Sequence, residues 1–137
     1  MTADDSDANA LTIRIARLFD GFAPESGPYF EPERFRIGDP AERERVAAYL
    51  RGGIVLVRST ALDPDMVDRG RGHVVPASFR TDGAWIWSDG LMYYVREHGV
   101  APVSEFYDHI VAHGYRCPAP DTEAVDRAAR RLAEARR

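Results

Sequence analysis

The side chains that could bind a metal ion or perform acid–base chemistry are concentrated near the end of the chain. Glu105, His109 and His113 follow one another at intervals of four residues, so on a helix they share one face within reach of a single metal ion. The H-E-x-x-H arrangement, which gives a zinc hydrolase its general base, does not occur here. His113 is also explained by its place in the last turn of a predicted helix, where a basic side chain stabilises the helix dipole. We therefore predict that the protein holds no metal ion and uses no cofactor.

Other sequence signatures of catalysis are weak. Cys117, the single cysteine, precedes a proline and does not begin a helix that would stabilise a thiolate. The chain has no G-x-S-x-G elbow, and G-R-G at 70–72 lacks the third glycine and the flanking elements of a phosphate-binding loop. Several carboxylates occur in pairs whose spacing singles none of them out: Asp63 and Asp65, Asp82 and Asp89, and Glu97 and Glu105. No residue is therefore predicted to be catalytic, and the chain is predicted not to be an enzyme.

A group of arginines supports an alternative function. Arg58, Arg69 and Arg71 flank or belong to the loop 59–72, and a forked guanidinium group binds anions bidentately. An anion-binding site between this loop and the 78–89 hairpin would make the chain a small enzyme or a ligand-binding domain. The same arginines can instead pair with the aspartates of the loop, so both interpretations remain open.

The segment 79–89 contains both tryptophans and a strong turn signal. Asp82-Gly83 tolerates the positive φ angles of a type I′ turn. This turn predicts a hairpin in which Thr81 lies opposite Ala84, and the register of the two strands follows from it.

The predicted register separates two faces of the hairpin. Phe79 and Ile86 share one face, and Arg80, Trp85 and Trp87 share the other. If Phe79 and Ile86 face the core of a small domain, the second face is exposed, and Arg80 stacks on Trp85 as a cation–π pair.

An exposed face of this kind predicts an interaction surface, because tryptophan, tyrosine and arginine dominate interaction hot spots. The predicted partner-binding residues are Arg80, Trp85, Trp87 and Tyr93. The partner is a protein, and a second copy of the chain is one candidate. The alternative is that the two indole rings are buried beneath the N-terminal loop that contains Tyr29 and Phe30, since large aromatic side chains are usually well buried.

The regular elements that must position these residues follow from hydrophobic periodicity and capping signals. Residues 11–22 fit both a helix and a strand, and the helix accounts for more of the apolar positions. A helix with a capping box is predicted to begin at Asp39-Pro40-Ala41-Glu42 and to end at Gly52-Gly53. Further helices are predicted after Ser88-Asp89, after Pro102 and after Asp121. Strands are predicted at 54–58, 74–81 and 84–87, with the apolar run at 54–57 as a central strand covered on both faces.

Composition limits the classes of protein that remain. The chain has 137 residues, a net charge of −4 and no lysine among its 18 basic residues. An acidic protein is a poor nucleic-acid binder, and no apolar run approaches the length that crosses a bilayer. Residues 1–9 are acidic and lack the features of a signal peptide. We therefore predict a disordered tail at 1–9 and a cytoplasmic protein without nucleic-acid or membrane partners.

The segment F-R-T-D-G-A-W-I-W-S-D-G-L-M-Y-Y-V-R-E-H-G-V-A-P resembles a group of small actinobacterial proteins. These share an R-T-D-G-x-W-x-W-[S/T]-D motif followed by an aromatic Y-Y helix, and some of them resemble immunity proteins of polymorphic toxin systems. The similarity covers about residues 53 to 113. It implies a protein that neutralises a cognate toxin by binding it, and it implies no catalytic residue.

Together these features predict one α+β domain over residues 10–137. A small antiparallel sheet of three or more strands, including the 74–87 hairpin, is packed by four or five helices. The predicted function is non-enzymatic protein binding of the immunity type.

Overall fold

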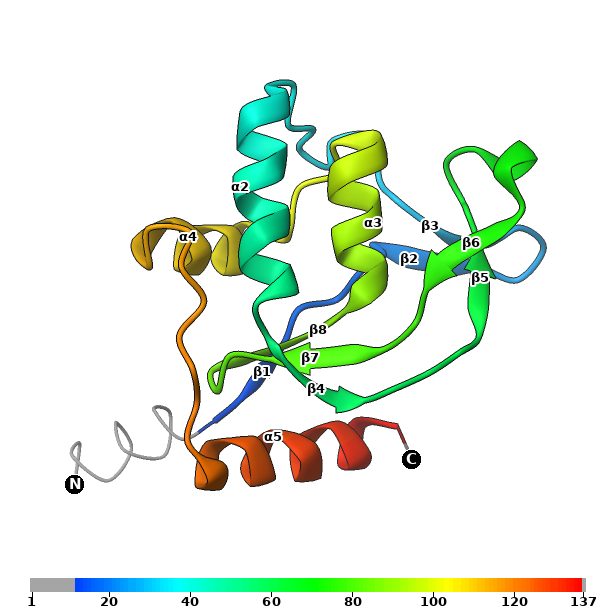
Figure 1. Ribbon diagram of the computed structural model, residues 1–137. Helices are drawn as coiled ribbons and strands as arrows, with labels where there is room; N and C mark the ends of the chain where they lie inside the picture. The colour runs from blue at the N-terminus through cyan, green and yellow to red at the C-terminus, as the bar shows by residue number, and fades with distance from the viewer. Residues whose placement is uncertain (1–11, 137) are drawn as a thin grey trace, which may run out of the picture.

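The computed structural model describes residues 12–136 and has the predicted α+β architecture (Figure 1). The predicted tail at 1–9 lies outside the described residues. The helices are α2 (Pro40–Arg51), the 3₁₀ turn η1 (Arg69–Arg71), α3 (Asp89–His98), α4 (Ser104–Ala112) and α5 (Thr122–Ala135). The strands are β1 (Arg14–Ile15), β2 (Gly21–Ala23), β3 (Gly27–Tyr29), β4 (Ile54–Val57), β5 (Leu62–Pro64), β6 (His73–Pro76), β7 (Phe79–Thr81) and β8 (Trp85–Ser88).

The main sheet has four strands in the order β1-β8-β7-β4. β8 pairs antiparallel with β7 and parallel with β1, and β7 pairs antiparallel with β4. The predicted central strand β4 is therefore an edge strand, and its first residue, Ile54, is exposed. The prediction was wrong because a short run of β-branched residues does not reveal how many neighbours a strand has.

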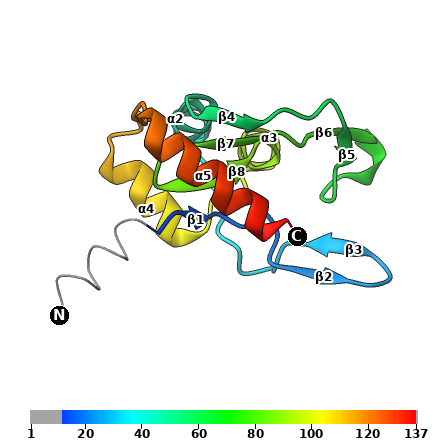
Figure 2. The same cartoon turned by 90° about the horizontal axis from the view of Figure 1, so that it is seen from below.

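Both faces of this sheet are covered. On one face, Trp85 and Trp87 pack with residues of α2, α3 and α4, and on the other Ile86 packs with Ala128 and Leu132 of α5. Figure 2 views the molecule from the α5 side, where α5 lies across the strands. Because neighbouring residues of a strand point to opposite faces, β8 contributes side chains to two separate clusters.

Two small hairpins lie together at one end of the molecule (Figures 1 and 2). β2 pairs with β3, and β5 pairs with β6. The first hairpin begins in the 11–22 segment, for which a helix was favoured, and continues into the predicted N-terminal loop that contains Tyr29 and Phe30. In the second hairpin, β5 lies within the predicted loop 59–72 and β6 follows that loop. The predicted strand 74–81 is divided between β6 and β7, which belong to different sheets. Short strands rich in glycine and proline give little periodic signal, which explains these errors.

The helix boundaries follow the predicted capping residues in three helices. The side chains of Asp39, Ser88 and Asp121 each accept a backbone hydrogen bond at the start of α2, α3 and α5. The predicted capping box of α2 is absent, because Glu42 accepts hydrogen bonds from the hydroxyls of Tyr107 and Tyr115 instead. The capping residues therefore locate where helices begin, whereas the partner of Glu42 depends on how α2 packs against α4.

Among residues 12–136, none of the helices combines the length and the apolar composition that a membrane-spanning helix requires.

Candidate functional site

The hairpin that carries both tryptophans has a register two residues away from the predicted one. Thr81 lies opposite Ile86, and Arg80 lies opposite Trp87. Of the two central residues of the corner, Asp82 and Gly83, only Gly83 has a positive φ, of 95°, whereas a type I′ turn needs positive φ at both. The corner is therefore wider than predicted. A shift of two residues leaves every side chain on its predicted face.

The tryptophans are nevertheless buried. Trp87 has 0% of its surface exposed and Trp85 has 6%. The indole N–H of Trp87 donates to the carbonyl of Leu50 over 3.1 Å, and Trp85 stacks on Phe106 with ring centroids 5.0 Å apart. The predicted exposure of this face is wrong, because α2, α3 and α4 cover it while α5 covers the other. The alternative of burial is correct, although the covering elements are these helices and not the loop at 29–30.

The other two predicted partner-binding residues are engaged inside the fold. The guanidinium of Arg80 donates to Asp89 over 2.7 Å and to the carbonyls of Arg51 and Gly53, so it does not stack on Trp85. The cation above the Trp85 ring is Arg14, 4.4 Å from the ring centroid. Tyr93 donates its hydroxyl hydrogen to the buried carboxylate of Asp65.

The arginines of the alternative anion site do not converge. Arg69 donates to the carbonyl of Ser26 in the β2–β3 hairpin, and Arg71 pairs with Glu97 of α3 over 2.7 Å. Arg58 is exposed at the end of β4. Because two of the three guanidinium groups bind different parts of the chain, they do not form one anion-binding cluster.

The acid and the two histidines spaced along α4 and its C-cap also point to different partners. Glu105 pairs with Arg14, and Nε2 of His109 lies 2.8 Å from Asp82 Oδ2. Nδ1 of His113 bonds to the backbone carbonyl of His109. Among the described residues no group of three or more His, Cys, Asp or Glu side chains could hold a metal ion. Burial and the neighbouring Asp82 raise the pKa of the Cys117 thiol to about 11, which disfavours the thiolate form.

Two buried aspartates, which the sequence did not single out, organise the interior. Asp65 Oδ1 accepts the backbone N–H groups of Val67 and Asp68, both at 2.8 Å. Its Oδ2 accepts the Tyr93 hydroxyl at 2.6 Å and lies 2.7 Å from His98 Nε2. Burial alone would raise the pKa of Asp65, but the hydrogen bonds from His98, Tyr93 and the backbone outweigh it and hold the pKa well below its usual range.

Asp82 repeats this arrangement at the tryptophan hairpin. Its Oδ1 accepts the N–H groups of Ala84 and Trp85, both at 2.8 Å. Its Oδ2 accepts the Tyr49 hydroxyl at 2.5 Å and the Nε2 hydrogen of His109; Nε2 is the donor because a carboxylate can only accept. Burial, followed by the hydrogen bond to Asp82, raises the pKa of Tyr49 well above its usual value.

The two carboxylates therefore stabilise turns and are poorly placed for catalysis. Each closes a turn through the N–H groups two and three residues ahead. Each also binds a tyrosine and a histidine, which come from α3 for Asp65 and from α2 and α4 for Asp82. Both side chains are fully buried. Because hydrogen-bond donors from within the chain occupy both oxygens of each carboxylate, we infer that these two clusters stabilise the fold.

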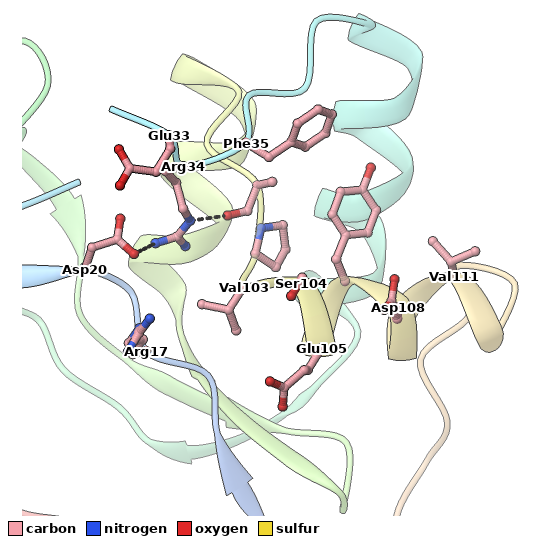
Figure 3. A pocket seen from close by; sticks show the side chains of 13 residues that line it. Arg17, Asp20, Glu33, Arg34, Phe35, Val103, Ser104, Glu105, Asp108 and Val111 are labelled. Carbon is pink, nitrogen blue, oxygen red and sulfur yellow. Dashed lines mark hydrogen bonds and ion pairs between the residues drawn. The ribbon is translucent and has the colours of Figure 1, made fainter. Parts of the chain in front are cut away.

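A surface hollow near the start of α4 has a different character. It has a volume of about 560 Å³ and is formed by the segment around Arg17 and Asp20, the loop at 33–35 and residues 101–111 (Figure 3). Two apolar side chains at this hollow are exposed, Phe35 by 64% and Val111 by 47%. Water-exposed apolar side chains beside a concavity are typical of a binding surface.

The walls of the hollow are held in place by Arg34. Its side chain is only 6% exposed and pairs with Asp20 over 3.1 Å. It also donates to the carbonyls of Leu18 and Ala101, and Figure 3 shows the bond between Arg34 and Asp20. Burial lowers the pKa of Arg34, against the opposing effect of Asp20. These bonds fix the loop at 33–35 beside the start of α4, so the hollow is preformed.

Sequence reasoning missed this site. Its residues come from a loop without periodicity and from the surface of α4, and no motif links the two segments.

Comparisons with family models, with curated proteins and with solved structures found no match to this chain.

Proposed function

We propose that the chain is a protein-binding domain and that its contact surface is the hollow bordered by Phe35 and Val111. The observation that supports this proposal is the exposure of these two apolar side chains beside one concavity. An exposed phenylalanine costs solvation free energy in the isolated chain, and a partner that covers it recovers about 25 cal/mol per Å² of buried apolar surface.

A binding role also agrees with the chemistry of the remaining polar groups. Asp65 and Asp82 serve the fold, as do Arg80 and Tyr93. The features that the hollow offers are shape, apolar surface and charge, which are the means of recognition in protein complexes.

The resemblance of the 79–102 segment to proteins of toxin systems extends the proposal. On this basis the partner is a cognate protein toxin, the chain is its immunity protein, and the complex forms in the cytoplasm. Two residues of the shared motif, Trp85 and Trp87, belong to the core against which α4 packs, and a third, Asp82, accepts the backbone N–H of Trp85. The motif therefore supports this role indirectly, by positioning the helix that borders the hollow.

Site-specific photocrosslinking tests the proposal. A photoreactive phenylalanine analogue at position 35 is expected to form an adduct with a polypeptide in lysate of the source organism. The matched control carries the analogue at Phe22, which is 70% exposed in β2 and does not line the hollow. An adduct at both positions, or at neither, contradicts the assignment of the hollow as the contact surface.

A further inference from the structure

We infer that the hollow accepts a basic side chain of the partner, an arginine or a lysine. This inference rests on the proposed function and specifies the chemistry of the partner at the same site. The residues that carry it are Glu33 and Asp108, together with the exposed ring of Phe35.

The charges around the hollow decide whether a cationic or an anionic group of a partner fits it. Four carboxylates and two guanidinium groups belong to its lining. Two of the carboxylates are neutralised within the chain, since Asp20 pairs with Arg34 and Glu105 pairs with Arg14. Within residues 12–136, the side chains of Glu33 and Asp108 take part in no ion pair or hydrogen bond, and both residues are exposed. They remain available to a partner.

Arg17 is the one cation of the lining without an acidic partner among the described residues. It also lines the neighbouring hollow formed with Arg14, Trp85 and Val103. Figure 3 shows Arg17 on the β1 side and Asp108 on α4, across the view from each other. The part of the hollow next to α4 therefore presents carboxylate charge.

The apolar walls suit the same kind of side chain. Arginine and lysine carry an apolar stem and a charged head, so the stem can pack along Pro102 and Val103 while the head reaches a carboxylate. The face of Phe35 is available for a cation–π contact. An acidic side chain beside α4 would instead meet the unneutralised carboxylate of Asp108. The net charge of −4 of the whole chain also favours the approach of a basic partner.

Selection of random peptides displayed on phage against the immobilised full-length protein tests the inference. We expect the selected peptides to be enriched in arginine or lysine next to apolar residues. The affinity of the most enriched peptide is then measured with the double variant Glu33→Gln, Asp108→Asn. Two exposed ion pairs contribute little each, so the expected loss of affinity is about five- to tenfold, and it should shrink at high salt.

A charge-matched control separates local contact from net charge. The double variant Glu25→Gln, Asp126→Asn removes the same charge from exposed positions outside the hollow, and its affinity should stay within about twofold of the wild type. An equal loss in both double variants overturns the inference, because the effect would then come from the total charge of the chain. Selection of acidic or neutral peptides, or of none, also overturns it.

The variant Phe35→Ala distinguishes failure of the inference from failure of the proposed function. If Phe35→Ala weakens peptide binding and Glu33→Gln, Asp108→Asn does not, the hollow is a contact surface without the proposed preference for a basic group. If neither variant weakens binding, both proposals are wrong.

Discussion

Replacing Asp82 with alanine tests whether this carboxylate serves the fold. The substitution removes the acceptor of four hydrogen bonds, which come from two backbone N–H groups, the Tyr49 hydroxyl and His109. Ala84 is exposed and His109 is partly exposed, so their N–H groups can bond to water instead. The Tyr49 hydroxyl and the N–H of Trp85 belong to buried residues and would be left without a partner.

The expected loss follows from these two orphaned donors. An unsatisfied buried donor costs about 1–3 kcal/mol, so Asp82→Ala should lower the free energy of unfolding by about 2–6 kcal/mol. Asp82→Asn keeps the oxygen that accepts the backbone N–H groups, and its amide meets Tyr49 and His109, both of which can rotate or change tautomer to accept. The expected loss in free energy of unfolding for Asp82→Asn is about 1–2 kcal/mol, because neutral hydrogen bonds replace the stronger charge-assisted ones.

Urea denaturation, monitored by tryptophan fluorescence, measures the free energy of unfolding of both variants, since both indoles are buried near Asp82. Asp63→Ala is the control, because Asp63 is an exposed aspartate of β5, and it should change the free energy of unfolding by less than about 0.5 kcal/mol. A loss below about 1 kcal/mol for Asp82→Ala would refute the structural role. Unchanged stability combined with lost partner binding would make Asp82 a functional carboxylate.

Three further outcomes are expected. Trp87→Ala should cost about 3–5 kcal/mol in urea melts, because it empties a fully buried site, whereas Phe22→Ala on the surface should cost less than about 1 kcal/mol; similar small losses would contradict the buried position of Trp87. Gly83→Val should destabilise the chain by more than about 1 kcal/mol, since Gly83 has positive φ and a Cβ there lies 3.0 Å from Pro120. A melting temperature equal to that of the wild type would argue against this turn. Asp65 has a lowered folded-state pKa, so its contribution to stability is present above the unfolded pKa of about 3.9 and is lost as pH falls through the folded value. The stability gap between wild type and Asp65→Asn should therefore narrow below about pH 4 in acid titrations, and a gap that is constant with pH would show that the carboxylate charge is not involved.

Local chemistry explains what could be predicted from the sequence. The starts of α2, α3 and α5 depend on Asp39, Ser88 and Asp121, whose side chains cap the helix from within the same short segment. The Asp82-Gly83 corner was also identified, and the alternation of side chains along β8 separated Trp87 from Ile86. Each of these features involves residues only a few positions apart.

The candidate site could not be predicted in the same way. The hollow forms because Arg34 joins its loop to Leu18, Asp20 and Ala101, which are distant in the chain. No periodicity or motif reports such contacts, and the loop carries no regular pattern.

The burial of the tryptophans shows the limit of what could be predicted from the sequence by itself. Strand alternation determined which side chains of β8 share a face, because that is a property of the local backbone. Whether a face is covered depends on which helices fold back onto it. Here α5 covers the Ile86 face and α2, α3 and α4 cover the Trp87 face, and only the tertiary structure decides this, because packing between distant elements sets the burial of a side chain.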